Sequence, residues 1–381
     1  MMQKLLKIIR LLMTRATSTT LAEHEKEAYT MKAMVLKEFC EIGIKGEPRK
    51  KVDLPLKEEP LEMVELPDPV PESQQILVKV SACGVCHTEL DEIEGRLVPP
   101  RFPVVLGHEI VGRVAALGSG VTRFKAGDRV GVAWIYSSCG RCEFCLRGDE
   151  NLCDQFQATG LHANGGYAQH TVVSQDFAYP IPERFSDAQA APLLCAGVIG
   201  YRALRLSGVK PDQILGLYGF GASAHIAIQV AKHWNCKVFV FTRKGQKDHQ
   251  NLAKELGADW VGATGDTPPE KLDCAIDFTP VGEPVREALG ILRRGGRVVI
   301  NAIRKINPIP ELDYAKYVWY EKEIKSVANV ARKDAEEFLP LAAQIEIIPT
   351  VTEFELHQAN QALVLLKQGK MQGAGVLRMP D

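Results

Sequence analysis

The stretch ILGLYGFGASA, residues 214–224, decides the fold of the second half of this chain. The apolar run 214–218 predicts a buried strand, and a helix is expected over residues 222–233. Between them, G-x-G-x-x-A in a strand–turn–helix setting lets the backbone approach a pyrophosphate at the start of a helix. We therefore expect Gly219, Gly221 and Ala224 to bind a dinucleotide cofactor.

The pattern on either side of this stretch predicts two different kinds of structure. After Cys195, strand-like runs such as KVFVF (237–241), CAIDF (274–278) and RVVINA (297–302) alternate with helical segments. This alternation is typical of a doubly wound α/β unit with a parallel sheet. Residues 31–176 are short, β-branched runs separated by Gly and Pro, which predicts a mostly-β unit. The polar, proline-rich stretch 46–71 is too polar and interrupted for core and is expected to be a surface excursion.

Length and charge restrict the class of protein. A chain of 381 residues exceeds what one hydrophobic core usually organises, so two domains are expected. A formal net charge of −1 gives no attraction for nucleic acid or anionic membranes, and no apolar run is long enough for a membrane span. The ten cysteines are spaced like metal ligands rather than like a disulfide framework, which favours a reducing, cytoplasmic location.

The first thirty residues differ from the rest of the chain. Residues 1–22 contain no acidic residue. On a helical wheel one side has Lys4, Lys7, Arg10 and Arg15 and the other largely has Leu5, Ile8, Ile9 and Leu12, a basic amphipathic pattern. Two interpretations stay open for residues 1–30. They are a disordered or misassigned start, which we favour, or a transit peptide for an organelle such as the mitochondrion.

Four cysteines in one short loop form the strongest local signal. Their spacing is Cys139-x2-Cys142-x2-Cys145-x7-Cys153. Four thiolates this close can enclose one zinc ion, and four ligands are typical of a structural zinc site. An iron–sulfur cluster would favour a shorter last gap followed by proline, whereas Asp154 follows Cys153 here.

A second group of metal ligands is distributed along the chain. Cys86, His108 and Cys195 are far apart in sequence, but each lies at the end or beginning of a predicted element. Three protein ligands leave a fourth position of zinc open, as catalytic zinc requires. Glu109 is expected to support these ligands or to join them, and Cys83, Cys40, Cys236 and Cys274 are assigned to packing.

The residues after KVFVF bear on the choice of cofactor. At this position an acidic residue would bind the adenosine ribose of NAD, but the chain has Thr242, Arg243 and Lys244. Losing a carboxylate and gaining cations suits a 2′-phosphate, so NADP is slightly favoured over NAD. A solvated basic loop that accepts either cofactor is the alternative.

The motifs CGVCHTEL, GHE, the four-cysteine loop, PLLCAG and G-x-G-x-x-A, in this order, resemble a zinc-dependent alcohol dehydrogenase of the medium-chain dehydrogenase/reductase family. The resemblance covers roughly residues 31–377. It implies a GroES-like, mostly-β catalytic domain (31–196), a Rossmann domain (197–325) and a C-terminal segment (326–381) that returns to the catalytic domain. It also implies two zinc ions per subunit, small-molecule alcohols and aldehydes as substrates, and a homodimer or homotetramer.

By position, the resemblance makes Cys86, His108 and Cys195 the catalytic zinc ligands, with Glu109 beside them. Thr88 becomes the hydroxyl that accepts the substrate proton, His87 touches a cofactor phosphate, and Trp134 forms a wall of the substrate pocket or simply packs in the core. Three positions depart from the family pattern. Glu89 replaces an aspartate that steadies the histidine ligand, Glu94 replaces a histidine that ends the proton relay in some members, and Ala374 replaces an arginine that contacts the pyrophosphate.

The expected activity is therefore the reversible oxidation of alcohols to aldehydes or ketones, with hydride transfer to NAD(P). Two alternatives stay open. One is an NADPH-dependent aldehyde reductase of the cinnamyl-alcohol-dehydrogenase type. The other is a non-catalytic zinc- and dinucleotide-binding redox protein, which would have no need of the hydroxyl of Thr88.

Overall fold

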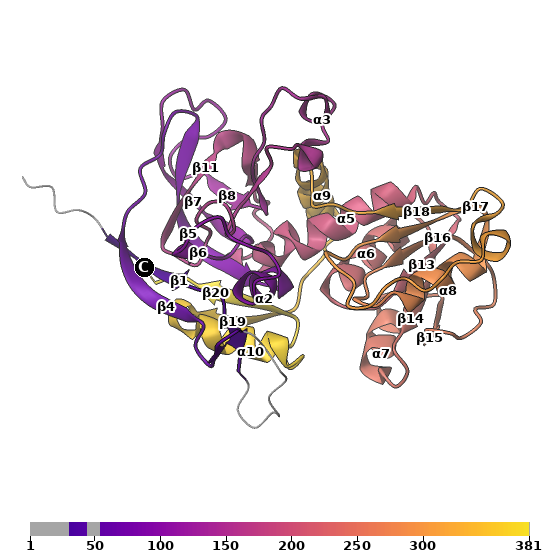
Figure 1. Cartoon of the computed structure of the whole chain (residues 1–381). Coiled ribbons are helices and arrows are strands. Elements are labelled where there is room, and N and C mark those ends of the chain that lie inside the picture. Colours follow the sequence, from indigo (N-terminus) through magenta and orange to yellow (C-terminus); the bar gives the residue numbers. More distant parts are fainter. Residues whose placement is uncertain (1–29, 44–53, 381) are drawn as a thin grey trace, which may run out of the picture.

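The computed structural model describes residues 30–43 and 54–380, and almost all of the predicted basic segment 1–30 lies outside them. Figure 1 shows two sheet-based halves, with helices α5 and α9 between them. The strands of the first half are mainly antiparallel, whereas those of the second half are parallel. Within the described ranges, no helix is long and apolar enough to cross a membrane.

The second half contains a six-stranded parallel sheet in the order β15-β14-β13-β16-β17-β18. Its central strand β13 is buried at every position, as expected for a parallel strand covered on both faces. The α/β prediction for this half is confirmed. The strands are β13 (Ile214–Tyr218), β14 (Lys237–Thr242), β15 (Trp260–Ala263), β16 (Leu272–Asp277), β17 (Leu292–Ile300) and β18 (Glu323–Ser326).

The first half is built on a seven-stranded sheet in which β5 pairs with β7, β11 and β20. The C-terminal strands β19 and β20, yellow in Figure 1, belong to this sheet, so the end of the chain returns to the first half. The seven strands are β5 (Gln75–Val85), β7 (Ile110–Leu117), β8 (Arg129–Val132), β11 (His170–Ser174), β12 (Ala178–Pro180), β19 (Val351–Glu355) and β20 (Ala374–Arg378). Shorter sheets use β1 (Thr30–Leu36), β2 (Glu41–Ile42), β3 (Leu56–Lys57), β4 (Leu61–Pro67), β6 (Val104–Val105), β9 (Ile135–Ser137) and β10 (Gln157–Ala158).

Helices cover the sheets and connect them. The α-helices are α2 (His87–Ile93), α3 (Glu143–Leu146), α4 (Asp187–Ala190), α5 (Ala196–Ser207), α6 (Ala222–His233), α7 (Lys247–Glu255), α8 (Glu283–Ile291), α9 (Arg332–Gln344) and α10 (Ala359–Lys367). Short helical turns are η1 (Glu150–Leu152), η2 (Gln175–Phe177), η3 (Ala191–Leu194), η4 (Tyr314–Val318) and η5 (Leu356–Gln358). Helix α6 has the predicted bounds, so the glycine-rich turn joins β13 to α6 as expected.

The polar stretch 46–71 contains a strand that the sequence did not predict. The polar stretch 46–71 is not only a surface excursion, because within it β4 pairs with β1 from Leu61 to Pro67. Strand β4 is at the edge of the three-stranded sheet β4-β1-β6, and most of its residues are exposed. An edge strand needs few apolar side chains, so its composition does not distinguish it from a loop.

Candidate active site

Three separate elements bring one group of metal-binding side chains together. Cys86 lies between β5 and α2, His108 and Glu109 precede β7, and Cys195 precedes α5. One donor atom from each of the four residues lies within 4.8 Å of the others. His108 and Glu109 are buried, whereas Cys86 and Cys195 are partly exposed as whole residues.

The distances in this cluster fit zinc. Cys86 Sγ and His108 Nε2 are 3.6 Å apart. Bonds of about 2.3 Å to sulfur and about 2.0 Å to nitrogen put the S···N edge of a tetrahedral zinc site at about 3.6 Å. The donor set of thiols, imidazole and carboxylate is also one that zinc prefers. The residues therefore fit a zinc ion, and Cys86, His108 and Cys195 alone would leave its fourth position open.

Glu89 holds two of these ligands in place. Its Oε1 lies 2.6 Å from His108 Nδ1, which leaves Nε2 directed at the cluster. Its Oε2 accepts a hydrogen bond from the backbone N–H of Cys86 at 2.8 Å, while Cys86 Sγ accepts one from Thr88 N. This reciprocal capping box starts α2 and fixes Cys86 at the helix N-terminus. Glutamate in place of aspartate therefore still reaches the histidine.

The buried groups of the cluster titrate unusually. The pKa of Cys86 is raised well above its ordinary value by its hydrogen bond with Cys195 and by burial. Burial lowers the pKa of His108, but the charges of Glu89 and Cys86 and the hydrogen bonds to both together outweigh it and raise that pKa well above the ordinary value. Burial raises the pKa of Glu109 to about 7. A bound cation would reverse this order for the thiols, because a metal ion deprotonates the thiols that ligate it.

The remaining predicted residues surround this cluster. Thr88 is 4% exposed, and its hydroxyl makes no hydrogen bond to any residue the structure describes. The Trp134 ring centre lies 6.3 Å from that of His108 and 6.0 Å from that of Phe156, so these aromatic rings form one side of the site. His87, the first residue of α2, is exposed, although desolvation by neighbouring segments of the chain lowers its pKa.

The four-cysteine loop forms a second compact group. Cys142 Sγ and Cys139 Sγ lie 3.5 and 3.9 Å from Cys145 Sγ, and all four thiols, Cys153 included, lie within 4.8 Å of one another. Four Zn–S bonds of about 2.3 Å give S···S edges of about 3.8 Å, so the loop fits zinc. The backbone N–H groups of Arg141 and Cys142 lower the pKa of Cys139 to about 6, which favours the thiolate.

The glycine-rich turn lies at the carboxyl end of the parallel sheet, where such folds bind ligands. Gly219 has a φ of 81°, a left-handed conformation that favours glycine. Thr242, at the carboxyl end of β14, is fully buried and its Oγ1 accepts a hydrogen bond from Gln250. Arg243 and Lys244 are exposed beside it, and neither side chain is paired within the described part of the chain.

Comparisons with known proteins identify the family. Residues 72–183 match the family model "Alcohol dehydrogenase GroES-like domain", and residues 224–344 match "Zinc-binding dehydrogenase". The chain is 45% identical over 328 residues to a Mycobacterium tuberculosis protein named "Probable alcohol dehydrogenase AdhA", covering 85% of this chain and 94% of that one. The chain belongs to the zinc-binding alcohol dehydrogenases of the medium-chain dehydrogenase/reductase family.

Further relatives agree with this family. An alcohol dehydrogenase of Geobacillus stearothermophilus is 35% identical over 84% of this chain and 96% of its own. The structure of a cinnamyl alcohol dehydrogenase from Sorghum bicolor superposes with a TM-score of 0.79 at 27% identity, covering 92% of this chain and 98% of that one. The protein is thus an oxidoreductase that acts on alcohols, and the non-catalytic alternative is set aside.

Sequence reasoning missed a glycine that shapes the site of this dehydrogenase. A Cβ at Gly84 would lie 1.8 Å from Glu109 Oε2, so only glycine leaves room for that carboxylate. Glu94, which stands where some family members have a relay histidine, forms ion pairs with Arg96 and Lys367. The capping pattern from Cys86 to Glu89 was a readable signal, because a side-chain acceptor followed three residues later by Glu starts many helices.

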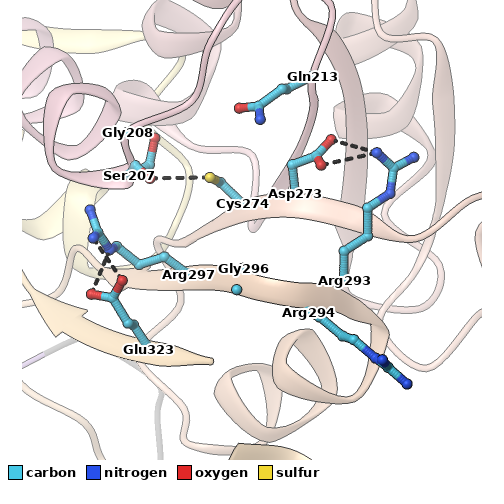
Figure 2. A pocket seen from close by; sticks show the side chains of 11 residues that line it. Ser207, Gly208, Gln213, Asp273, Cys274, Arg293, Arg294, Gly296, Arg297 and Glu323 are labelled. Carbon is cyan, nitrogen blue, oxygen red and sulfur yellow. Dashed lines mark hydrogen bonds and ion pairs between the residues drawn. The ribbon is translucent and has the colours of Figure 1, made fainter. Parts of the chain in front are cut away.

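A separate hollow of about 240 Å³ lies at the opposite, amino edge of the parallel sheet. Figure 2 shows that two of its arginines face acidic partners. Arg293 is paired with Asp273, and Arg297 is paired with Glu323. The charges of these two arginines are therefore already neutralised.

Proposed function

We propose that this alcohol dehydrogenase uses two zinc ions per subunit and an NAD(P) cofactor. Cys86, His108 and Cys195 hold the catalytic ion, with Glu109 beside them, and the four-cysteine loop holds the structural ion. Gly219, Gly221 and Ala224 bind the cofactor. The convergence of the first four donor groups within 4.8 Å, with the backbone N–H of buried Thr88 bonded to Cys86 Sγ, carries the proposal.

The chain's own residues have distinct tasks in this scheme. When bound, zinc supplies a Lewis acid for the alcohol oxygen, and NAD(P) supplies the hydride acceptor. The Thr88 hydroxyl accepts the proton of the alcohol, since it is buried beside Cys86 and has no other described partner. Glu89 keeps the imidazole of His108 in one orientation. The rings of Trp134 and Phe156 exclude water from one side of the substrate.

Zinc content and turnover of Cys86→Ala test the proposal. We expect about two zinc ions per subunit in the wild type and about one in the variant, measured by elemental analysis, with turnover at 340 nm lost and dinucleotide binding kept. Cys236→Ala is the matched control, because Cys236 is a buried thiol outside both clusters. Full turnover in Cys86→Ala would show that this assignment of the catalytic site is wrong.

The cofactor is proposed to be NADP in preference to NAD. The support is the exposed, unpaired pair Arg243 and Lys244 beside the carboxyl end of β14. Comparing kcat/KM for NADP and NAD tests this preference. Arg243→Ala should reduce kcat/KM for NADP and leave kcat/KM for NAD unchanged. A clear NAD preference in the wild type would mean that the basic loop is only solvated.

A homodimer or homotetramer is proposed as the assembly. Strand β18 is an edge strand, all of its residues are exposed, and Tyr314, Trp319 and Tyr320 are exposed near it in sequence. An exposed edge with large apolar side chains is typical of a protein-binding surface. Light scattering of the purified protein distinguishes a monomer from either assembly.

The unpaired thiols favour a reducing compartment, so a cytoplasmic location is proposed.

Reduction of cinnamyl-type aldehydes is a second candidate for the physiological reaction. The similarity to the Sorghum bicolor cinnamyl alcohol dehydrogenase and the neighbouring Trp134 and Phe156 rings support it. A panel of aliphatic and aromatic alcohols and their aldehydes separates the two candidates. A large preference in kcat/KM for the aromatic aldehydes would favour the second one.

A further inference from the structure

We propose that Arg304 binds the dinucleotide phosphate nearer the nicotinamide, and that Asp91 holds Arg304 in place until the cofactor enters. This inference rests on the proposed cofactor site at Gly219–Ala224. Arg304 follows β17 in the second half, whereas Asp91 lies on α2 of the first half. Their contact, from Arg304 Nε to Asp91 Oδ1, measures 3.3 Å and joins the two halves.

The loop that carries Arg304 is anchored beside the glycine-rich turn. Lys305 Nζ donates to Asp277 Oδ2 at 2.5 Å and to the carbonyl oxygen of Thr279 at 2.6 Å. Asp277 is fully buried at the end of β16. A Cβ at Gly219 would lie 3.1 Å from Thr279 Cγ2, so Thr279 borders the dinucleotide turn. Through these contacts Lys305 fixes its neighbour Arg304 close to that turn.

The strand order decides which end of the cofactor Arg304 meets. A dinucleotide that crosses the carboxyl edge from β14, where Arg243 lies, passes the turn after β13 and continues towards β16 and β17. Arg304 follows β17 and touches α2, the helix that starts at Cys86 of the metal cluster. Arg304 is therefore on the nicotinamide side of the turn, while Arg243 is on the adenosine side.

The guanidinium group of Arg304 also has hydrogen-bond donors available for a phosphate. Lys305 is neutralised by buried Asp277, but the side chain of Arg304 is 43% exposed and only its Nε is engaged within the described chain. Its two terminal nitrogens are free to form the paired hydrogen bonds that guanidinium makes with phosphate. Asp91 Oδ1 also accepts a 2.5 Å hydrogen bond from Arg96, so Asp91 stays paired when Arg304 leaves it.

His87 completes this arrangement on the other side. His87 and Asp91 are four residues apart on α2 and therefore share one face of that helix. An incoming phosphate would meet Arg304 from one half of the protein and His87 from the other. On cofactor binding, the phosphate would replace the Asp91 carboxylate as the partner of Arg304. The phosphate would then connect Arg304 of the second half with His87 of the first.

Binding of AMP, ADP and the reduced cofactor to the zinc-replete protein, measured by titration calorimetry, tests this inference. AMP carries only the adenosine-side phosphate, whereas ADP adds the second one. We expect Arg304→Gln to weaken ADP and cofactor binding about tenfold or more and to leave AMP binding unchanged. Arg294→Gln is the matched control, because Figure 2 places Arg294 at the hollow on the opposite edge of the sheet.

The reciprocal variant sharpens the test. Asp91→Asn removes the carboxylate that competes for Arg304, so ADP should bind more tightly than to the wild type, and Asp91→Asn/Arg304→Gln should behave like Arg304→Gln. Unchanged ADP affinity in Arg304→Gln, while the wild type binds ADP, would overturn the inference and leave the proposed function intact. A wild type that binds none of the three ligands would instead overturn the proposed cofactor site. If Asp91→Asn does not fold, Arg304→Gln alone decides.

Discussion

At the scale of single residues, Glu89 organises the metal cluster more than any other side chain outside it. It is fully buried, and its two oxygens contact His108 Nδ1 and the backbone N–H of Cys86. A buried carboxylate is stable only when it is paired and hydrogen-bonded. Glu89 therefore links the start of α2 to the orientation of the histidine ligand.

Glu89→Gln should weaken zinc binding at this cluster by about 10- to 100-fold, the usual cost of losing a partner that orients a ligand. The amide can still accept the hydrogen bond of Cys86 N, but the negative charge beside His108 is lost. Competition with a chelator measures the affinity. Glu62→Gln is the control, since Glu62 is an exposed residue of β4. Equal zinc affinity in Glu89→Gln and the wild type would contradict this role.

Thr88→Val should reduce kcat about 10²- to 10⁴-fold, the range that positioned proton transfer contributes. Valine keeps the shape of threonine but removes the hydroxyl that accepts the proton. Thr88→Ser restores a hydroxyl and should retain most of the turnover. Zinc content, measured alongside, should be the same in all three proteins. A fully active Thr88→Val would remove Thr88 from the proton path.

At the scale of elements, the four-cysteine loop contains little regular secondary structure. Helix α3 has four residues and η1 has three, and neither starts with a side-chain capping bond. Backbone N–H groups bond to the sulfurs of Cys139 and Cys153 instead. A zinc ion shared by the four thiols would thus supply the binding energy that orders the loop.

Cys142→Ser should lower the melting temperature before it alters the chemistry. If the weaker ligand costs about 3 kcal/mol, a shift of roughly 6–12 °C is expected for a domain of 150–250 residues. Differential scanning fluorimetry gives the shift, and turnover at 340 nm at low temperature should stay near the wild-type value. An unchanged melting temperature together with lost turnover would refute the structural role of this loop.

At the scale of the whole molecule, a buried ion-pair network connects the four-cysteine loop to α5 and α9. Asp334 of α9 is fully buried and accepts hydrogen bonds from Arg202 at 2.6 Å and Arg205 at 2.5 Å, both on α5. Arg202 also donates to Asn151 of η1. Since α5 begins directly after Cys195, this network joins the loop to the element that carries a ligand of the other cluster.

Asp334→Ala should destabilise the protein by about 3–5 kcal/mol, because it leaves two arginines without their buried partner. Chemical denaturation measures the free energy of unfolding. The control is Glu353→Ala, which breaks only the exposed pair with Arg378 and should cost less than about 1 kcal/mol. A loss for Asp334→Ala no larger than that of the control would mean that the network adds nothing to stability.

The sequence alone determined the features that depend on neighbours along the chain. The four-cysteine spacing and the glycine-rich turn after β13 are local, so the loop and helix α6 were predictable from pattern. The resemblance to a known family then assigned Cys86, His108 and Cys195 to one site, which their distant positions in the sequence could not. Strand β4 was missed because an edge strand can be polar.

Only the tertiary structure decided the features that depend on contacts between distant segments. The close approach of Gly84 to Glu109, the bond between Glu89 and His108, and the contact of Arg304 with Asp91 each join residues whose separation in the sequence carries no signal. Periodicity and spacing report short-range geometry, whereas these contacts arise from the pairing of β5 with β7 and from the meeting of the two halves. The sequence therefore determined which chemical groups are present, and the fold decided which of them act together.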